Sequence, residues 1–103
     1  MTKISNIPSV QSVVLIAQSK GINDVILSPG SRNAPFALSF SAIESFNCIS
    51  VLDERSAGFI ALGMAQQTHK PVILSCTSGS AVINYAPAMV EAFYQKIPLI
   101  AVT

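Results

Sequence analysis

The sequence predicts an α/β fold, a three-layer arrangement in which helices cover both faces of a parallel sheet. Short apolar runs alternate along the chain with longer segments whose apolar residues recur at helical spacing. The short runs are apolar throughout rather than at every second position, which is typical of strands buried on both faces. Strand and helix alternation of this kind is also the usual pattern of parallel sheets.

Four strands and four helices are expected, in strict alternation. The first helix is expected at about 8–20, with Ser or Asn near its start and Gly21 as its stop. Pro87 lies inside the last predicted helix and should kink or break it. The remaining elements are strands at about 24–28, 48–52, 71–76 and 98–103 and helices at about 33–45, 54–67 and 78–95.

The low charge content indicates that part of the surface is covered. Of 103 residues, 50% are hydrophobic and only 11% are charged, against about 25% in typical soluble domains. The chain also stops at or just after the fourth predicted strand, with no helix behind it. We therefore expect residues 1–103 to be a fragment, with a covering segment or partner chain outside the sequence.

Several functional classes are disfavoured by composition. The net charge is +1 and no basic run is present, which argues against nucleic-acid binding. No apolar run approaches the roughly 20 residues of a membrane span, and the N-terminus lacks the pattern of a signal peptide, so a cytoplasmic location is expected. Cys48 and Cys76 are expected to be buried thiols, and the lone His69 a surface residue that leaves no His-rich metal site.

Unusual residues gather where predicted strands end. The turns are "SPGSRNAP" at 28–35, "LDERSAG" at 52–58 and "CTSGSAVIN" at 76–84. In open parallel sheets, ligands bind outside the carboxyl ends of the strands. The sequence therefore predicts that the three turns share one edge of the sheet, where a binding site would lie.

The first turn carries a possible anion site. Ser31 and Arg32 lead into a helix, whose free N–H groups favour an anion, and the Arg32 guanidinium suits a carboxylate or phosphate. The alternative is that Ser31 or Asn33 is an ordinary N-cap and Arg32 is solvated. Neither a dinucleotide-binding fingerprint nor a P-loop is present.

The third turn allows two interpretations as well. Gly79 would let a ligand approach the backbone, and the hydroxyls of Thr77 and Ser78 could exchange hydrogen bonds with it. The alternative is a simple capped helix start.

The second turn places two acids at the head of a helix. Asp53 is the expected N-cap, and Glu54 then takes the first helical position, where the helix dipole stabilises an anion. A purely structural role explains both. The helix that follows is rich in small residues, which predicts close packing against a partner subunit or another domain. An acid at the head of such a helix would be partly desolvated, which suits proton transfer. The small residues are Ala57, Gly58, Ala61, Gly63 and Ala65.

The motifs together resemble a known family. "SPGSR", "DERSAGFIALGMA" and "VILSCTSGSAVINYAPAMVEA" are similar to the N-terminal, pyrimidine-binding (PYR) domain of thiamine-diphosphate enzymes, over about residues 8–103. Among these enzymes, they look most like the MenD-type synthases of menaquinone biosynthesis. The broader family has T-S-G-P-G-x-x-N in the third turn; here Ser80 and Ala81 replace Pro-Gly.

The resemblance implies roles for individual residues. Glu54 would be the catalytic acid, which bonds N1′ of the cofactor's aminopyrimidine and so promotes removal of the thiazolium C2 proton. Ser31 and Arg32 would bind a substrate carboxylate. The residues implied to bind the cofactor are Glu54, Thr77, Ser78, Gly79 and Asn84.

The resemblance also implies an activity. It predicts a transferase that decarboxylates 2-oxoglutarate and adds the remaining four-carbon unit to isochorismate, with thiamine diphosphate as cofactor. By this resemblance, residues 1–103 would be an incomplete N-terminal PYR domain whose central and C-terminal, diphosphate-binding domains are absent. Mg²⁺ or Mn²⁺ would be bound through the missing C-terminal domain, and the full-length protein would be a homodimer or homotetramer. The 103-residue chain alone should therefore be inactive. Two alternatives stay open: another thiamine-diphosphate enzyme, of the acetolactate-synthase or oxo-acid decarboxylase type, and a non-catalytic α/β anion-binding module.

Overall fold

Helices and strands alternate in a computed structural model that describes residues 4–103. The predicted order is confirmed, except that the last predicted helix is two helices. The helices are α1 (Pro8–Ser19), α2 (Ala34–Ala42), α3 (Glu54–Thr68), α4 (Ser80–Ile83) and α5 (Ala86–Gln95). The strands are β1 (Asp24–Leu27), β2 (Asn47–Ser50), β3 (Val72–Ser75) and β4 (Leu99–Val102).

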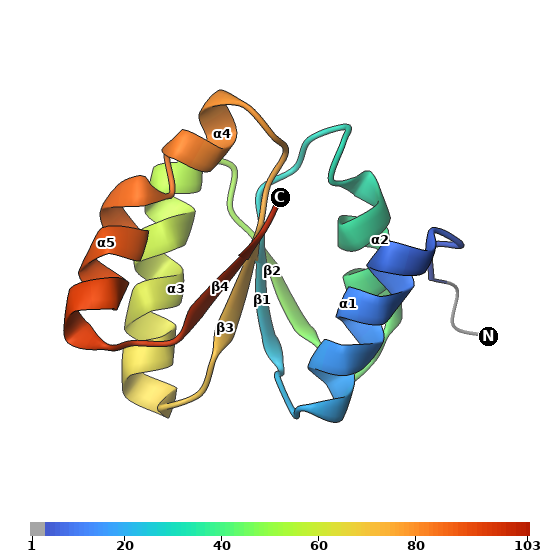
Figure 1. Ribbon diagram of the computed structural model, residues 1–103, viewed down its shortest axis with the longest axis horizontal. Coiled ribbons are helices and arrows are strands. Elements are labelled where there is room, and N and C mark those ends of the chain that lie inside the picture. The colour runs from blue at the N-terminus through green and yellow to red at the C-terminus, as the bar shows by residue number, and fades with distance from the viewer. Residues whose placement is uncertain (1–3) are drawn as a thin grey trace.

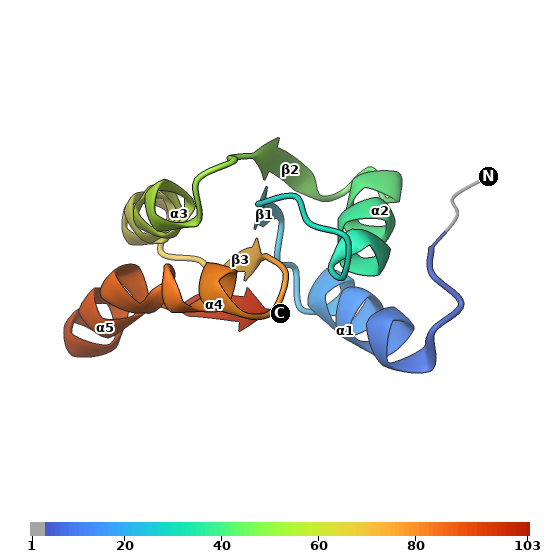
Figure 2. The same cartoon turned by 90° about the horizontal axis from the view of Figure 1, so that it is seen from above.

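The strands form one parallel sheet in the order β2-β1-β3-β4. In the centre of the sheet, Val25 of β1 is aligned with Cys48 of β2 and with Ile73 of β3. Helices α1 and α2 lie on one side of the sheet and α3 and α5 on the other (Figures 1 and 2). The predicted three-layer α/β fold is therefore confirmed.

Each face of the sheet has its own apolar core. The core on the side of α1 and α2 includes Val14 and Phe40, whose ring makes an edge-to-face contact with Phe46 at 5.0 Å between centroids. The core on the side of α3 and α5 contains Ile26 and Leu74. Aromatic pairs in this geometry stabilise a core beyond the apolar area that they bury.

The expectation that all four strands are buried is correct only for the centre of the sheet. Every residue of β3 is buried, as are three of the four in β1, whereas β2 and β4 lie at the two edges and contain no fully buried residue. Edge strands have a neighbour on one side only, so an apolar run does not distinguish an edge strand from a central one.

Two helices differ from their predicted bounds. Helix α2 ends at Ala42, before the predicted 45, because Ile43 adopts an extended conformation. The last predicted helix is broken between α4 and α5, with Pro87 in the first turn of α5. A proline is tolerated at that position because its missing N–H would have no helical partner there. The predicted effect of Pro87 is thus confirmed.

The small-residue face of α3 packs within the chain, so its assignment to a partner subunit or another domain is wrong. Ala57, Ala61 and Ala65 are at most 1% exposed and pack against the sheet. A Cβ atom added at Gly58 would lie 2.8 Å from the Cβ atom of Ala88 on α5. Small side chains let α3 approach both the sheet and α5.

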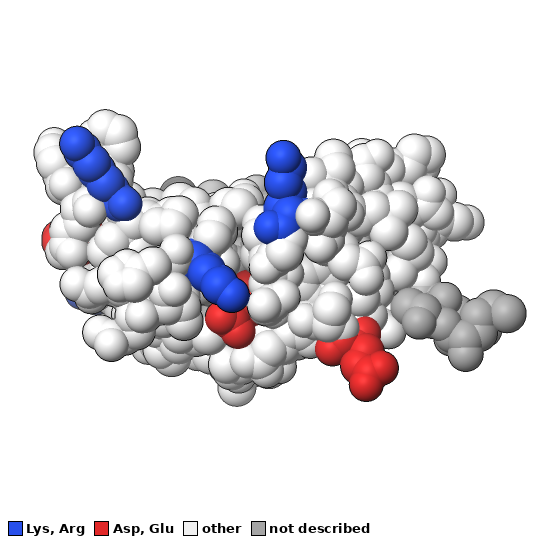
Figure 3. Space-filling view, turned by 90° about the horizontal axis from the view of Figure 1, so that it is seen from below, with Lys and Arg blue, Asp and Glu red and all other residues white. Residues whose placement is uncertain are grey.

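Charged side chains are sparse on the surface, as Figure 3 shows for one face. Large apolar side chains are exposed instead, among them Leu38, Leu52, Phe93 and Tyr94, each at least 71% exposed. Within residues 4–103, no helix has the length and apolar character needed to cross a membrane.

Candidate functional site

The three turns singled out in the sequence share one edge of the sheet. Because all four strands are parallel, their carboxyl ends point the same way, toward the top of Figure 1. Ser28 connects three of these ends, since its N–H donates to Ser75 O at 2.9 Å and its hydroxyl donates to Val51 O at 2.7 Å. We call this edge, with its turns at 28–33, 51–54 and 76–79, the rim.

Helix α3 begins at the rim with the two acids of the second turn. Asp53 is the N-cap, as predicted: its Oδ2 accepts hydrogen bonds from the hydroxyl of Ser56 at 2.6 Å and from the N–H of Ser56 at 3.0 Å. These bonds lower the pKa of Asp53. The carboxylate of Asp53 is therefore committed to the helix start, which leaves Glu54 as the acid available for chemistry.

Glu54 is the first residue of α3 and is half-buried. Its Oε1 lies 3.5 Å from Nδ2 of Asn84, the residue at the end of α4. The break between α4 and α5 thus brings an amide donor to the carboxylate. Glu54 is neither remote from the rim nor freely solvated.

Arg32 and Ser78 connect the first turn to the third. Nη1 of Arg32 donates to Oγ of Ser78 at 3.0 Å, and both residues are exposed. The backbones of the same turns approach closely, since a Cβ atom at Gly30 would lie 2.8 Å from Cβ of Thr77. Arg32 is therefore exposed yet oriented, with its remaining N–H groups available to an anion.

The alternative interpretation of the first turn, a side-chain cap, is wrong. Asn33 occupies the N-cap position of α2, but its side chain caps nothing. Instead, Nδ2 of this buried residue donates to Ser28 O at 3.1 Å and to Ser75 Oγ at 3.4 Å. Ser31 is exposed, and its only described bond is through its carbonyl oxygen, which accepts from the N–H of Ala34 at 3.5 Å.

Gly79 precedes α4 with a φ of 92° and no side-chain cap, so the capped-start alternative is wrong for the third turn as well. Positive φ strains residues with a Cβ atom, which explains a glycine here. A Cβ atom at Gly79 would meet no other atom within 4 Å. The backbone at Gly79 is thus open to a ligand.

The predicted site residues form two groups, Glu54 with Asn84 and Arg32 with Ser78. Sequence reasoning gave no role to Tyr85, which is 1% exposed and lies between α4 and α5, two residues before Pro87. Cys76 is buried as predicted, while Cys48 is only half-buried. Burial raises the pKa of both thiols.

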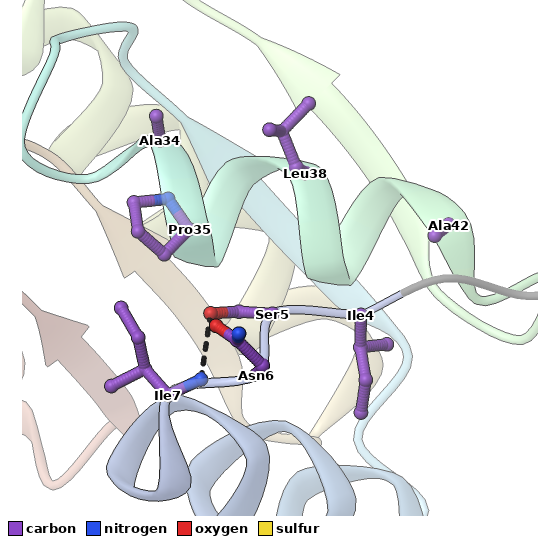
Figure 4. Close-up of a pocket in the computed structure, with 8 residues that line it drawn as sticks. All are labelled: Ile4, Ser5, Asn6, Ile7, Ala34, Pro35, Leu38 and Ala42. Carbon is purple, nitrogen blue, oxygen red and sulfur yellow. Dashed lines mark hydrogen bonds between the residues drawn. The ribbon is translucent and has the colours of Figure 1, made fainter.

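An open groove lies away from the rim residues described above. It has a volume of about 630 Å³ and lies between α2 and the segment that precedes α1 (Figure 4). Its lining includes Ile4, Ile7, Pro35 and Leu38 and none of the predicted site residues. Among residues 4–103, no three His, Cys, Asp or Glu side chains come together as metal ligands would.

Comparison with known proteins identifies similar chains. Residues 10–103 match the family model described as thiamine pyrophosphate enzyme, N-terminal TPP binding domain. The chain is 55% identical over 93 residues to the 2-succinyl-5-enolpyruvyl-6-hydroxy-3-cyclohexene-1-carboxylate synthase of Flavobacterium johnsoniae, covering 90% of this chain and 17% of the relative. It is 50% identical over 101 residues to the enzyme of the same name from Christiangramia forsetii, covering 98% of this chain and 18% of the relative. The chain thus spans less than a fifth of the length of these relatives.

Two solved structures have a similar fold. Benzoylformate decarboxylase from Polynucleobacter necessarius superposes with a TM-score of 0.78 at 28% identity, over 89% of this chain and 17% of that one. A putative thiamin diphosphate-dependent enzyme from Mycobacterium smegmatis superposes with a TM-score of 0.77 at 29% identity, over 89% of this chain and 18% of that one.

Proposed function

We propose that this chain supplies one half of the active site of a synthase. The chain belongs to the thiamine pyrophosphate enzyme family, because residues 10–103 match the N-terminal TPP binding domain of that family. The synthase would decarboxylate 2-oxoglutarate and add the remaining unit to isochorismate. The relatives at 50% and 55% identity carry the corresponding name. The observation that carries the proposal is the half-buried Glu54 at the rim, with the Asn84 amide beside it.

The rim has the features that an aminopyrimidine ring requires. Glu54 offers a carboxylate oxygen to a ring nitrogen, and the backbone at Gly79 is open. The buried hydroxyl of Tyr85 has no hydrogen-bond partner among the described residues. An acid, an accessible backbone and an unused donor at one edge fit thiamine diphosphate, which supplies a carbon nucleophile when bound.

In such a site, the side chains of this chain would have different roles. Glu54 holds a proton between its carboxylate and the ring nitrogen, and the amide of Asn84 orients that carboxylate. Asp53 fixes the start of α3 through its bonds to Ser56, and so fixes the height of Glu54 above the sheet. Thr77, Ser78 and Gly79 would line the pyrimidine side of the site.

The guanidinium of Arg32, with the hydroxyl of Ser31, would bind a substrate carboxylate. Both 2-oxoglutarate and isochorismate are dianions, and guanidinium groups match carboxylates in charge and shape. The bond from Arg32 to Ser78 holds the guanidinium above the rim before substrate arrives, which reduces the ordering cost of binding.

The remaining elements of the proposal lie outside this chain. Mg²⁺ or Mn²⁺ would be held with the diphosphate by another domain, in a cytoplasmic homodimer or homotetramer. The exposed side chains of Phe93 and Tyr94 on α5 are suited to such a contact. A second candidate, a decarboxylase of 2-oxo acids, is favoured by the likeness in fold to benzoylformate decarboxylase.

The test is Glu54→Gln in the full-length enzyme. Hydrogen–deuterium exchange at C2 of bound thiamine diphosphate should fall by about 100-fold or more, because the carboxylate that would share a proton with the ring nitrogen is lost. Glu44→Gln, an exposed acid before β2, is the matched control. Exchange at the parental rate in Glu54→Gln would refute the assignment. In the parent protein, turnover of 2-oxoglutarate that depends on isochorismate would distinguish the synthase from a decarboxylase, which needs no acceptor. Failure of the parent protein to bind thiamine diphosphate would instead favour the anion-binding module.

A further inference from the structure

Asn33 is a buried residue whose amide joins the first turn of the rim to the end of β3. Its side chain is 1% exposed, and Nδ2 donates to Ser28 O at 3.1 Å and to Ser75 Oγ at 3.4 Å. The bond to Ser28 closes the turn on itself, and the bond to Ser75 connects the turn to the neighbouring strand. The amide therefore fixes residues 28–33 relative to the sheet.

Two further contacts join the same two segments. A Cβ atom at Gly30 would lie 2.8 Å from Cβ of Thr77, and Nη1 of Arg32 donates to Oγ of Ser78 at 3.0 Å. Both partners are half-buried in the Gly30 contact and exposed in the Arg32 contact, whereas Asn33 bonds to buried residues. The contacts thus run from the interior to the surface, and Arg32 takes its place at the exposed end of a series that begins at Asn33.

The stability of the fold alone does not explain an amide at position 33. Oδ1 of Asn33 is buried and accepts no hydrogen bond from residues 4–103, and a buried acceptor without a donor destabilises a fold. Asn33 is also the N-cap residue of α2, yet its side chain makes no cap bond. What the amide provides is a fixed turn next to the guanidinium of Arg32.

We propose that Asn33 is a positioning residue for Arg32: the buried amide fixes the first turn and so holds the guanidinium beside Ser78 before substrate binds. The inference rests on the proposed function, in which Arg32 binds a carboxylate of 2-oxoglutarate or isochorismate. A guanidinium that is already held loses less conformational freedom on binding than a free one. Asn33 therefore acts on substrate affinity without touching the substrate.

The test compares Asn33→Ala with Ser39→Ala in the full-length enzyme. Ser39 is a matched control because it is also polar and fully buried, but its hydroxyl accepts from the N–H of Ser5, away from the rim. Asn33→Ala should raise the KM for the substrate that Arg32 binds about fivefold, since the freed guanidinium must be ordered on binding. The kcat and the C2 exchange of bound thiamine diphosphate should stay parental, because Glu54 lies on another element, α3. Ser39→Ala should leave the KM unchanged.

A double-mutant cycle shows whether Asn33 acts through Arg32. In the Arg32→Ala background, Asn33→Ala should raise the KM no further, because the group that it positions is absent. Amide hydrogen exchange, measured without substrate or cofactor, should be faster in residues 28–33 of Asn33→Ala than of the parent. Ser75→Ala removes one acceptor of the amide and keeps the inference testable if Asn33→Ala does not fold. It should raise the same KM about twofold.

Three results would overturn the inference. A parental KM in Asn33→Ala, or in Ser75→Ala where Asn33→Ala does not fold, shows that the amide does not act on substrate binding. A full additional rise of the KM in the Arg32→Ala background shows that Asn33 acts by another route. An equal rise in Ser39→Ala shows that loss of any buried polar group has this effect. Failure of the proposed function is distinguishable, since it appears as a parental KM in Arg32→Ala itself or as parental exchange in Glu54→Gln.

Discussion

Gly58 of α3 and Ala88 of α5 approach so closely that a Cβ atom on Gly58 would stand 2.8 Å from the Cβ atom of Ala88. This contact lies one helical turn after Glu54. It determines how near the start of α5, with Asn84 and Tyr85 before it, comes to the acid. Helix packing and the candidate chemistry are therefore coupled at one glycine.

Replacing Gly58 with alanine should separate the two helices. The added methyl group overlaps Ala88, so we expect the free energy of unfolding to fall by about 1–3 kcal/mol. Cofactor C2 exchange should fall as well, because Asn84 and Tyr85 move with α5. Urea unfolding and the exchange assay measure the two effects.

The same helix supplies a control for that substitution. A Cβ atom at Gly63 would meet no atom within 4 Å, so Gly63→Ala should raise stability by about 0.5–1 kcal/mol through helix propensity. Equal stability of the two variants would show that α3 and α5 are free to adjust.

Asn84→Ala should weaken the chemistry more than the fold. Asn84 is exposed, so its loss affects stability little, but Glu54 loses the amide 3.5 Å from Oε1. We expect cofactor exchange to fall about tenfold through misplacement of the carboxylate. Asn47→Ala is the control, because Asn47 donates to Asp24 at 3.2 Å at the amino ends of the strands. If both variants exchange like the parent, Asn84 does not orient Glu54.

Asp53 should make stability depend on pH in the acid range. Its hydrogen bonds from Ser56 lower its pKa below the ordinary value of 3.8. A depressed folded-state pKa stabilises the fold fully above the unfolded value, and this contribution is lost as the pH falls through the folded one. Unfolding measured from pH 6 down to about pH 2 should therefore show a loss below about pH 4 that Asp53→Ala lacks.

Asp53→Ser separates the cap from the charge. Serine keeps an oxygen that accepts from the N–H of residue 56, but it does not titrate. The serine variant should be more stable than Asp53→Ala near neutral pH and should lack the acid-range loss. An acid-range loss of the same size in all three proteins would assign it to other carboxylates.

The fold and the head of α3 were predictable because they depend on local signals. Continuous apolar runs indicated the parallel sheet, an acid before a helix indicated the Asp53 cap, and Pro87 indicated the break after α4. The strand order β2-β1-β3-β4 was not predictable, since nothing local distinguishes the edge strands from the central ones. The roles proposed for Glu54 and Arg32 rest on the family resemblance, because a capped helix start explains the same residues in the sequence.

Long-range contacts account for what the sequence did not reveal. The bond from Arg32 to Ser78 spans 46 positions, and the contact of Gly58 with Ala88 joins two helices. The small-residue face of α3 is an example, because the spacing of its small residues indicates close packing but does not show which element they pack against. That partner is the sheet and α5 of the same chain.

Arg32→Ala should impair substrate use and leave the cofactor alone. The guanidinium is exposed and its described bond goes only to Ser78, so the fold does not depend on it. Loss of a charge-assisted hydrogen bond to a carboxylate should raise the KM for 2-oxoglutarate or isochorismate about tenfold or more. Ser78→Ala, which frees the guanidinium without removing it, should give a smaller increase. Lys20→Ala, at the C-terminal end of α1, should leave the KM unchanged. A large loss of thiamine diphosphate affinity in Arg32→Ala would instead assign Arg32 to the cofactor site.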